Sequence, residues 1–469
     1  MLHLKSAYDL RNLITTGEVS AREVLESHLK QIQRVNHSVN AIVTLDVERA
    51  VQWSIEADEH QAKGNDLGIL HGLPVVHKDL FTTAGMRTTF GSPIYKNHIP
   101  DADELIIERL RSAGAISIGK SNTPEFGAGS QTFNEVFGAT RNPYNLQKTC
   151  GGSSGGAAAA LASRMVPIAD GSDMGGSLRN PASFCNVVGF RPSTGRVPTW
   201  PSDNAWFSFG VQGPMARTVQ DVSLMLAAIA GPDPRVPLSI TESPDQFLGS
   251  LEVNLRGKRV AFAPTLGGLP VCREVVRVIE EQRRVFADLG CEVVDDCLNF
   301  DKADEVFRIL RAFRFAMKFG GLVERHREQM KETVLWNISE GDKLSGKDIA
   351  NAQRWRTELF SRATDFFGQF DFLVGPVTQV AAFNIEDEFV NEIEGTELTS
   401  YIDWMQSCYL VTVTGMPAIS VPAGFTASGL PVGVQIIGGY RQDLDVLKIA
   451  NAFELATNIS SQAPTLASF

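Results

Sequence analysis

The chain has 469 residues, of which 43% are hydrophobic and 21% are charged, a composition typical of a soluble protein with a substantial core. Its 54 acidic side chains outnumber the 43 lysines and arginines, which gives a net charge of −11. This excess disfavours nucleic acid and anionic membranes as partners, because no basic surface is available to neutralise phosphates. No apolar run is long enough to predict a membrane span.

Cysteines and histidines argue against two further classes of protein. The six cysteines are scattered without a C-x-x-C pair, which predicts reduced thiols and a cytoplasmic location. The eight histidines include no H-E-x-x-H pattern, so neither a metal nor another cofactor is expected.

The first elements follow from capping and apolar spacing. Ser20 precedes Glu23 in the form of a capping box, and apolar residues at helical spacing follow, so a helix is expected there. Residues 72–80 form a short apolar run that ends in charge, which predicts a buried strand. Residues 101–113 predict a helix that stops at Gly114, and a strand follows over 115–119.

The second half continues the alternation of strands and helices. A strand at 257–264, a helix at 271–289 and a strand at 291–296 predict a β–α–β unit. Further buried strands are expected at the ranges 370–376, 417–425 and 433–439, with a closing helix over 440–457. This alternation predicts an α/β fold in which helices cover both faces of one sheet.

One motif match contradicts its own context. Residues 114–121, GAISIGKS, fit the phosphate-loop pattern G-x-x-x-x-G-K-[ST]. A phosphate loop follows a strand and opens a helix, whereas here a helix precedes the motif and Ile116 and Ile118 lie inside the expected strand. Thr123 and Pro124 then follow where the helix should begin. The sequence therefore argues against ATP binding.

Three other residues suggest chemistry. Lys78 ends an apolar strand, and a buried neutral lysine can act as a general base for a serine without any histidine. A lysine that reaches the surface, or that pairs with Asp79, is the alternative. The glycines before Ser177 let backbone N–H groups converge on one point and stabilise an oxyanion. Ser153 lies in GGSSGG, which predicts a tight turn into a buried helix because AAAALASRM follows it.

At these residues the sequence resembles the amidase signature family over nearly its whole length. The matching stretches are GLPVVHKD (72–79), GKSNTPEFG (119–127), CGGSSGGAAAALAS (150–163), GSDMGGSLRNPASFCNVVGFRPSTGRVP (171–198), GPMARTVQD (213–221) and GMPAISVPAGF with GLPVGVQIIGG (415–439). The separations of 75 residues from Lys78 to Ser153 and 24 residues from Ser153 to Ser177 also match the family.

The resemblance implies a catalytic triad in which Lys78 is the base, Ser153 the proton relay and Ser177 the nucleophile. It also implies a cis peptide at Gly152–Ser153. The oxyanion hole would consist of the backbone N–H groups of Met174, Gly175, Gly176 and Ser177. Ser154, Asp173 and Arg179 would support these groups.

The implied fold is a single amidase domain over residues 1–469, with a mixed sheet of about eleven strands surrounded by helices. The expected sections are a helical part (1–70), the signature core (70–230), a more variable substrate-side region (231–410) and the closing strands and helix (411–460). Two residues depart from the family. Met174 replaces a frequent threonine, and His77 replaces a small or apolar residue; strand alternation points His77 away from the face that carries Lys78.

The substrate class follows from further departures. In the glutaminase subunits of tRNA-dependent amidotransferases an acidic residue precedes the GMPAISVP strand, but here that position holds Met405, and Asp403 is two positions away. Residues 206–212 replace the family's S-S-L-D-Q stretch by a more apolar one. These changes favour hydrolysis of aryl, acyl or other apolar amides by a stand-alone enzyme, with a small-molecule amide as partner and a homodimer as a family-level expectation. Candidate pocket residues are Phe126, Gly127, Trp206, Phe209 and Trp404.

Two other functions remain open from the sequence. The first is the glutaminase-type subunit of an amidotransferase, which would require a partner. The second is a non-catalytic binding protein on the same fold, although the intact Lys78, Ser153 and Ser177 argue against it.

Overall fold

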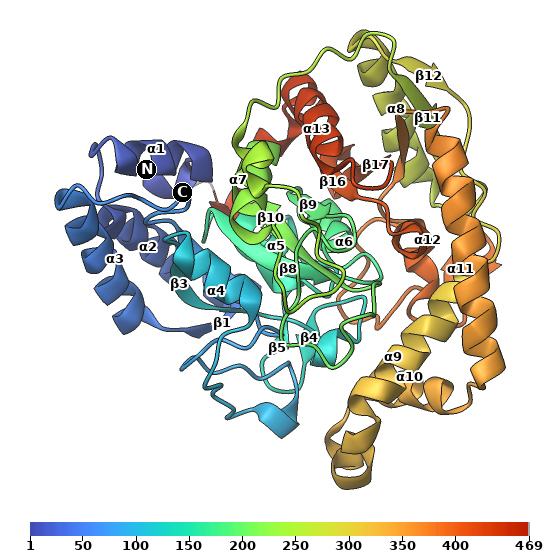
Figure 1. The fold of residues 1–469 in the computed structure, drawn as a ribbon, viewed down its shortest axis with the longest axis horizontal. Helices are drawn as coiled ribbons and strands as arrows, with labels where there is room; N and C mark the ends of the chain where they lie inside the picture. Colours follow the sequence, from blue (N-terminus) through green and yellow to red (C-terminus); the bar gives the residue numbers. More distant parts are fainter. Residues whose placement is uncertain (468–469) are drawn as a thin grey trace.

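A computed structural model describes residues 1–467 of the chain, and its centre is one mixed sheet of eleven strands (Figure 1). The order across the sheet is β1-β3-β2-β8-β10-β9-β16-β17-β13-β11-β12. In chain order these strands are β1 (Ile42–Leu45), β2 (Pro74–Lys78), β3 (Ile116–Ser121), β8 (Ile168–Asp173), β9 (Val188–Arg191), β10 (Val211–Ala216), β11 (Arg259–Phe262), β12 (Glu292–Val294), β13 (Phe372–Pro376), β16 (Ala418–Phe425) and β17 (Pro431–Gly438). The predicted fold class, an α/β fold with about eleven strands, is confirmed.

Thirteen α-helices surround the sheet in the described part of the chain. They are α1 (Ala7–Thr15), α2 (Ala21–Val39), α3 (Val47–Ala62), α4 (Leu105–Ser112), α5 (Gly155–Ala162), α6 (Arg179–Phe184), α7 (Val219–Ile229), α8 (Arg273–Asp288), α9 (Ala303–His326), α10 (Glu332–Asp342), α11 (Gly346–Phe367), α12 (Gln406–Thr414) and α13 (Asp443–Thr457). Figure 1 shows α1–α3 on one side of the molecule and α9–α11 on the opposite side. None of these described helices combines the length and apolarity that crossing a bilayer requires.

Three short two-stranded ribbons complete the strand set. They are β4 (Phe133–Asn134) with β5 (Gly138–Ala139), β6 (Arg141–Asn142) with β7 (Asn145–Thr149), and β14 (Glu392–Ile393) with β15 (Thr396–Glu397).

Strand β2 has the position that matters most for the site. It runs parallel to both of its neighbours, β3 and β8, and all five of its residues are buried. A strand enclosed on both faces carries a continuous apolar sequence, as residues 74–76 do, and Lys78 ends this strand. The C-terminal end of β2 therefore delivers a lysine to the interior.

The elements expected from the sequence lie close to their predicted ranges. Ser20 caps α2 and forms the predicted capping box with Glu23, since each residue bonds the backbone N–H of the other. The predicted β–α–β unit is β11-α8-β12, with its two strands parallel. The phosphate-loop match ends inside β3, and the next α-helix along the chain is α5, so the argument against that motif is confirmed.

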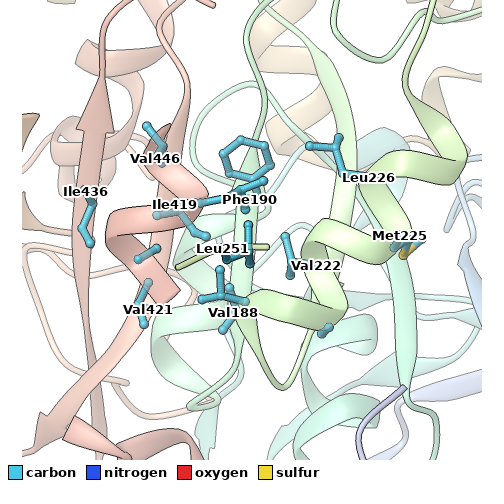
Figure 2. Close-up of a cluster of buried hydrophobic side chains, with 14 of the residues drawn as sticks. Val188, Phe190, Val222, Met225, Leu226, Leu251, Ile419, Val421, Ile436 and Val446 are labelled. Carbon is cyan, nitrogen blue, oxygen red and sulfur yellow. The ribbon is translucent and has the colours of Figure 1, made fainter. Parts of the chain in front are cut away.

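The largest hydrophobic cluster lies between the middle of the sheet and its covering helices. Figure 2 shows side chains from β9, β16 and β17 packed against α7 and α13. Val188, Phe190, Ile419 and Ile436 are fully buried there. This dry layer fixes the middle strands, and the ends of neighbouring β2 and β8 carry the polar site.

Candidate active site

The amine of Lys78 lies among three serine hydroxyls. Nζ is 2.8 Å from Oγ of Ser153, 2.9 Å from Oγ of Ser154 and 3.1 Å from Oγ of Ser172. The lysine is fully buried, so the alternative of a lysine that reaches the surface is wrong. Its neighbours are neutral hydroxyls, with no carboxylate of the described residues within ion-pair distance of Nζ.

This environment favours the neutral amine. Burial lowers the pKa of Lys78 to about 7, although the negative charges of Asp173 and Asp170 act in the opposite direction. A lysine with a pKa near neutrality is uncharged in a large fraction of molecules at pH 7. Lys78 can therefore accept a proton under ordinary conditions.

His77 fixes the strand that carries Lys78. Its Nδ1 lies 2.6 Å from Oδ2 of Asp170 on β8, and its Nε2 lies 2.7 Å from Oγ of Ser117 on β3. The second oxygen of Asp170 accepts the backbone N–H of Lys78 at 2.7 Å. His77 thus points away from the Lys78 amine, as alternation predicts, and joins β2 to both neighbours.

The segment before α5 brings the two serine loops together. The Gly152–Ser153 peptide is cis, as the resemblance implies. The next N–H, of Ser154, donates to the carbonyl of Ser177 at 3.2 Å. A Cβ at Gly156 would lie 2.3 Å from the backbone nitrogen of Asn122, so only glycine permits α5 to approach β3 this closely.

A buried ionic network holds the segment that carries Ser177. Arg179 binds Asp173 through Nε and Nη2, both at 2.9 Å, and Arg191 donates to the Asp173 carbonyl at 2.6 Å. Burial alone would raise the pKa of Asp173, but Arg179 and Arg191 lower it below its ordinary value. Asp173 and Arg179 therefore hold the loop in the way that the resemblance implies.

The backbone amides near Ser177 divide into two groups. Gly176, at φ +108°, donates its N–H to Oδ1 of Asp173 at 3.0 Å. The expectation that all four amides are available is therefore wrong for Gly176, because the carboxylate already occupies its N–H. The amides of Met174, Gly175 and Ser177 have no acceptor within the described chain.

A cavity of about 680 Å³ opens onto Ser153 and Ser177, a size that suits a small organic ligand. Met174 and Gly175 form part of its wall, as do Phe126 and Gly127, two of the predicted pocket residues. Most of the remaining wall comes from the residues after β2, from the loop that precedes β10 and from α9.

Three predicted pocket residues lie elsewhere. Trp206 is 72% exposed and points out of the loop whose neighbours line the cavity. Phe209 is fully buried beside Phe307, and Trp404 stacks on Phe184 with ring centroids 5.7 Å apart. Because Phe209 and Trp404 pack in the core and Trp206 faces solvent, none of the three lines the cavity.

Several wall residues were not among the sequence candidates. Helix α9 turns one face toward the cavity, with Arg311, Phe315 and Phe319 at helical spacing, and Phe126 stacks on Phe319 at 4.6 Å. The spacing was visible in the sequence, but nothing there showed which cavity the helix faces. Four charged side chains also belong to the wall, and they are Glu104, Asp203, Arg314 and Lys318.

The two residues that bear on glutamine recognition have different surroundings. Met405 lines the cavity. Asp403 does not, because its carboxylate binds Arg308 at 2.7 Å and the N–H groups of Thr399 and Ser400. The acid that a glutaminase site requires is therefore absent from this part of the wall.

Known proteins resemble this chain over nearly its whole length. The family model described as Amidase matches residues 23–447. An acylamidase of Rhodococcus erythropolis is 34% identical over 466 residues, which cover 99% of this chain and 98% of the relative. A glutamyl-tRNA(Gln) amidotransferase subunit from Bacillus velezensis is also 34% identical, with 98% of each chain covered. Among solved structures, a bacterial aryl acylamidase superposes with a TM-score of 0.93 at 31% identity, covering 100% of this chain and 99% of its own.

Proposed function

Since the chain belongs to the amidase signature family and hydrolyses amide C–N bonds, we propose that it cleaves aryl, acyl or otherwise apolar amides through an acyl-enzyme on Ser177. The observation that carries this proposal is the buried Lys78 amine at 2.8 Å from Ser153, a serine that lines a cavity with several aromatic side chains.

The first step is proton transfer along two hydroxyls. Lys78, in its neutral form, accepts the hydroxyl proton of Ser153, and Ser153 accepts the proton of Ser177. The Ser177 oxygen then forms a bond to the amide carbonyl carbon. Ser154 and Ser172 contact the same amine and orient its lone pair toward Ser153. This arrangement supplies a base without histidine.

The second step is stabilisation and collapse of the tetrahedral intermediate. The amides of Met174, Gly175 and Ser177 form the proposed oxyanion hole, and removal of one such donor costs about 2.7–4 kcal/mol in other acyl-transfer enzymes. As the C–N bond breaks, the relay returns its proton to the leaving amine. Water then enters and loses a proton to the same relay while its oxygen forms a bond to the acyl carbon. The ester bond to Ser177 breaks, the relay returns the proton to the Ser177 oxygen, and the acid leaves.

The apolar wall supports the substrate class. Phe126, Phe315 and Phe319 present aromatic rings to the cavity, and Met405 lies where a glutaminase would carry an acid. An aryl or alkyl group placed there is removed from water, which favours binding by about 25 cal/mol per Å² of apolar surface.

The glutaminase-type subunit is the alternative, because the Bacillus velezensis protein is as similar in identity as the acylamidase. The ion pair of Asp403 with Arg308 argues against it, since the carboxylate is occupied outside the cavity.

A cytoplasmic location also remains a proposal, and the six cysteines support it because all are unpaired thiols.

A substrate panel tests the proposal. Purified protein is assayed with glutamine, a short aliphatic amide, an anilide and an arylacetamide, by release of ammonia or aniline. We expect hydrolysis of the anilide and arylacetamide and no turnover of glutamine. Release of ammonia from glutamine but from none of the other amides would favour the glutaminase function instead. Release that requires a copurified partner would favour it as well.

A serine-directed fluorophosphonate separates an enzyme from a binding protein. The probe is expected to label wild-type protein at Ser177, as located by peptide mass spectrometry, and to leave the Ser177→Ala variant unlabelled. If Ser177 of folded wild-type protein does not react, the binding-only alternative is favoured.

A further inference from the structure

Arg311 stands out among the charges of the cavity wall. It lies on α9 with only 6% of its surface exposed, and part of that surface faces the cavity. Six charged side chains line this cavity, and they are Glu104, Asp173, Asp203, Arg311, Arg314 and Lys318.

The other five charges have compensation nearby. Asp173 pairs with Arg179 at 2.9 Å, and Arg314 pairs with Asp203 at 2.7 Å. Glu104 and Lys318 attract each other across the wall. Within residues 1–467, Arg311 has no carboxylate at ion-pair distance. A buried cation without a counter-charge is costly unless a ligand supplies one.

The hydrogen bonds of Arg311 leave one edge of the guanidinium open. Nε donates to Oδ1 of Asn337 at 3.1 Å, and Nη2 donates to the hydroxyl of Tyr401. Nη1 reaches only Sδ of Met174, at 3.8 Å, and a thioether is a weak acceptor. Because a guanidinium carries five N–H donors, the Nη1 edge retains capacity for a stronger acceptor.

A purely structural role for Arg311 explains part of this environment. The aromatic rings of Phe315 and Tyr401 lie 4.7 Å and 5.6 Å from its guanidinium carbon, and they stabilise a cation through their faces. Ring faces do not accept the in-plane N–H groups, so the Nη1 edge still lacks an oxygen partner. A carboxylate matches such an edge in both charge and geometry.

Arg311 lies close to the segment where the carbonyl of the substrate is expected to bind. Met174, its weak partner, belongs to the segment that offers the free amides. Phe307, one turn earlier on α9, has Cζ 3.4 Å from the place where a Cβ of Gly175 would lie. The open Nη1 edge therefore lies next to the side chain of Met174, whose backbone amide belongs to the proposed oxyanion hole.

We infer that Arg311 binds a carboxylate carried by the amide substrate, so that the enzyme acts on apolar amides with a carboxylate a short spacer away from the scissile bond. This inference rests on the proposed function and specifies its substrate. Met174 moves aside when the carboxylate binds, which an unbranched thioether side chain permits at low cost. Arg311 acts here as a specificity residue, because it contacts a group that does not react.

Matched substrate pairs test this inference. One pair compares anilides of dicarboxylic acids of four to six carbons with anilides of equally long monocarboxylic acids. The other compares acyl aminobenzoates with acyl toluidides, which places the carboxylate on the amine side. In Arg311→Met, we expect kcat/KM for the carboxylated member of one pair to fall about 10- to 100-fold relative to its neutral partner, as loss of a charge-assisted hydrogen bond predicts.

Two variants and the wild type make the test decisive. Arg314→Met removes the same charge from the same wall and should change the ratio less than threefold, because Asp203 already compensates Arg314. Arg311→Lys keeps the charge but loses the planar edge, so an intermediate ratio is expected, and this variant decides if Arg311→Met does not fold. Parallel losses on charged and neutral substrates in both pairs would overturn the inference and assign Arg311 a structural role. If wild-type protein hydrolyses no amide of either kind, the proposed function itself fails.

Discussion

The candidate site at the base of the cavity, which comprises Lys78, Ser153, Ser177 and the Asp173 network behind them and is called the floor, differs from the α9 wall in how its charges are paired. On the floor, Asp173, Arg179 and Arg191 are fully buried, and the one carboxylate pairs with both guanidinium groups. On the wall, Arg314 pairs with a partly exposed Asp203, and Arg311 has no acidic partner in the described chain. The carboxylate of Asp173 therefore finds its partners within the protein, whereas the guanidinium of Arg311 gains a counter-charge only from the proposed substrate.

This contrast separates chemistry from selection. A preorganised floor holds the proposed nucleophile, relay and amides without rearrangement during the reaction, which is how electrostatic stabilisation lowers a barrier. Wall residues contact the part of the proposed substrate that does not react, so they affect binding more than the chemical step. Variants of the floor should therefore reduce kcat or stability strongly, and variants of the wall should change KM.

The largest effect is expected for Ser177→Ala on the floor. Loss of the nucleophile should reduce kcat on the order of 10⁶-fold, the scale seen for other serine nucleophiles, because no other hydroxyl can form the acyl-enzyme. Single-turnover assays measure the rate, and thermal unfolding serves as the control, since Ser177 is only half-buried and its removal should change stability little. Retention of more than a hundredth of the wild-type rate would assign the nucleophile elsewhere.

A comparison of two aspartates tests the difference in charge compensation. Asp173→Asn removes the carboxylate that holds Arg179 and Arg191, and the free energy of unfolding should fall by about 3–5 kcal/mol because buried cations lose their partner. Asp203→Asn breaks the wall pair with Arg314, and a change below about 1 kcal/mol is expected for a partly exposed pair. Urea denaturation measures both. Equal losses would remove the distinction between floor and wall.

The smallest effect is expected for an aromatic ring of the wall. Phe319→Ala removes the ring that stacks on Phe126, and KM for an anilide should rise about tenfold, with kcat changed less. For a short aliphatic amide, which does not reach this ring, KM should stay within about twofold. Phe360→Ala on α11 is the matched control, because that ring packs on Tyr440 outside the cavity wall. A uniform loss with both substrates would point to a packing defect.

The sequence predicted the floor well because its chemistry depends on short, glycine-rich segments. Lys78 at the end of a buried strand, and the serines at 153 and 177, could be identified with their neighbours from spacing and family resemblance alone. Ser172, the third hydroxyl at the amine, was missed, since its serine directly precedes Asp173 without a distinguishing pattern. The occupied amide of Gly176 was also unpredictable, because it depends on where the Asp173 side chain turns.

The wall was predicted poorly for a physical reason. An aromatic residue packs equally well into a core or a cavity wall, so the sequence could not distinguish Phe209 and Trp404, which are core residues, from Phe315 and Phe319. Trp206 is exposed because only its neighbours on the loop turn inward. Arg311 carries no local signal at all, since the absence of a counter-charge is a property of the folded arrangement.

The central claim is that neutral Lys78 is the base, and the pH dependence of kcat/KM tests it most directly. Burial lowers the pKa of this amine to about 7, and the protonated amine cannot accept a proton. The rate should therefore fall about tenfold for each pH unit below that pKa and level off above it. Burial also raises the pKa of Glu104 to about 7, so the profile is repeated with Glu104→Gln, where the acid limb should persist. A profile that is flat from pH 5 to pH 9, or a limb that disappears with Glu104→Gln, would contradict the account.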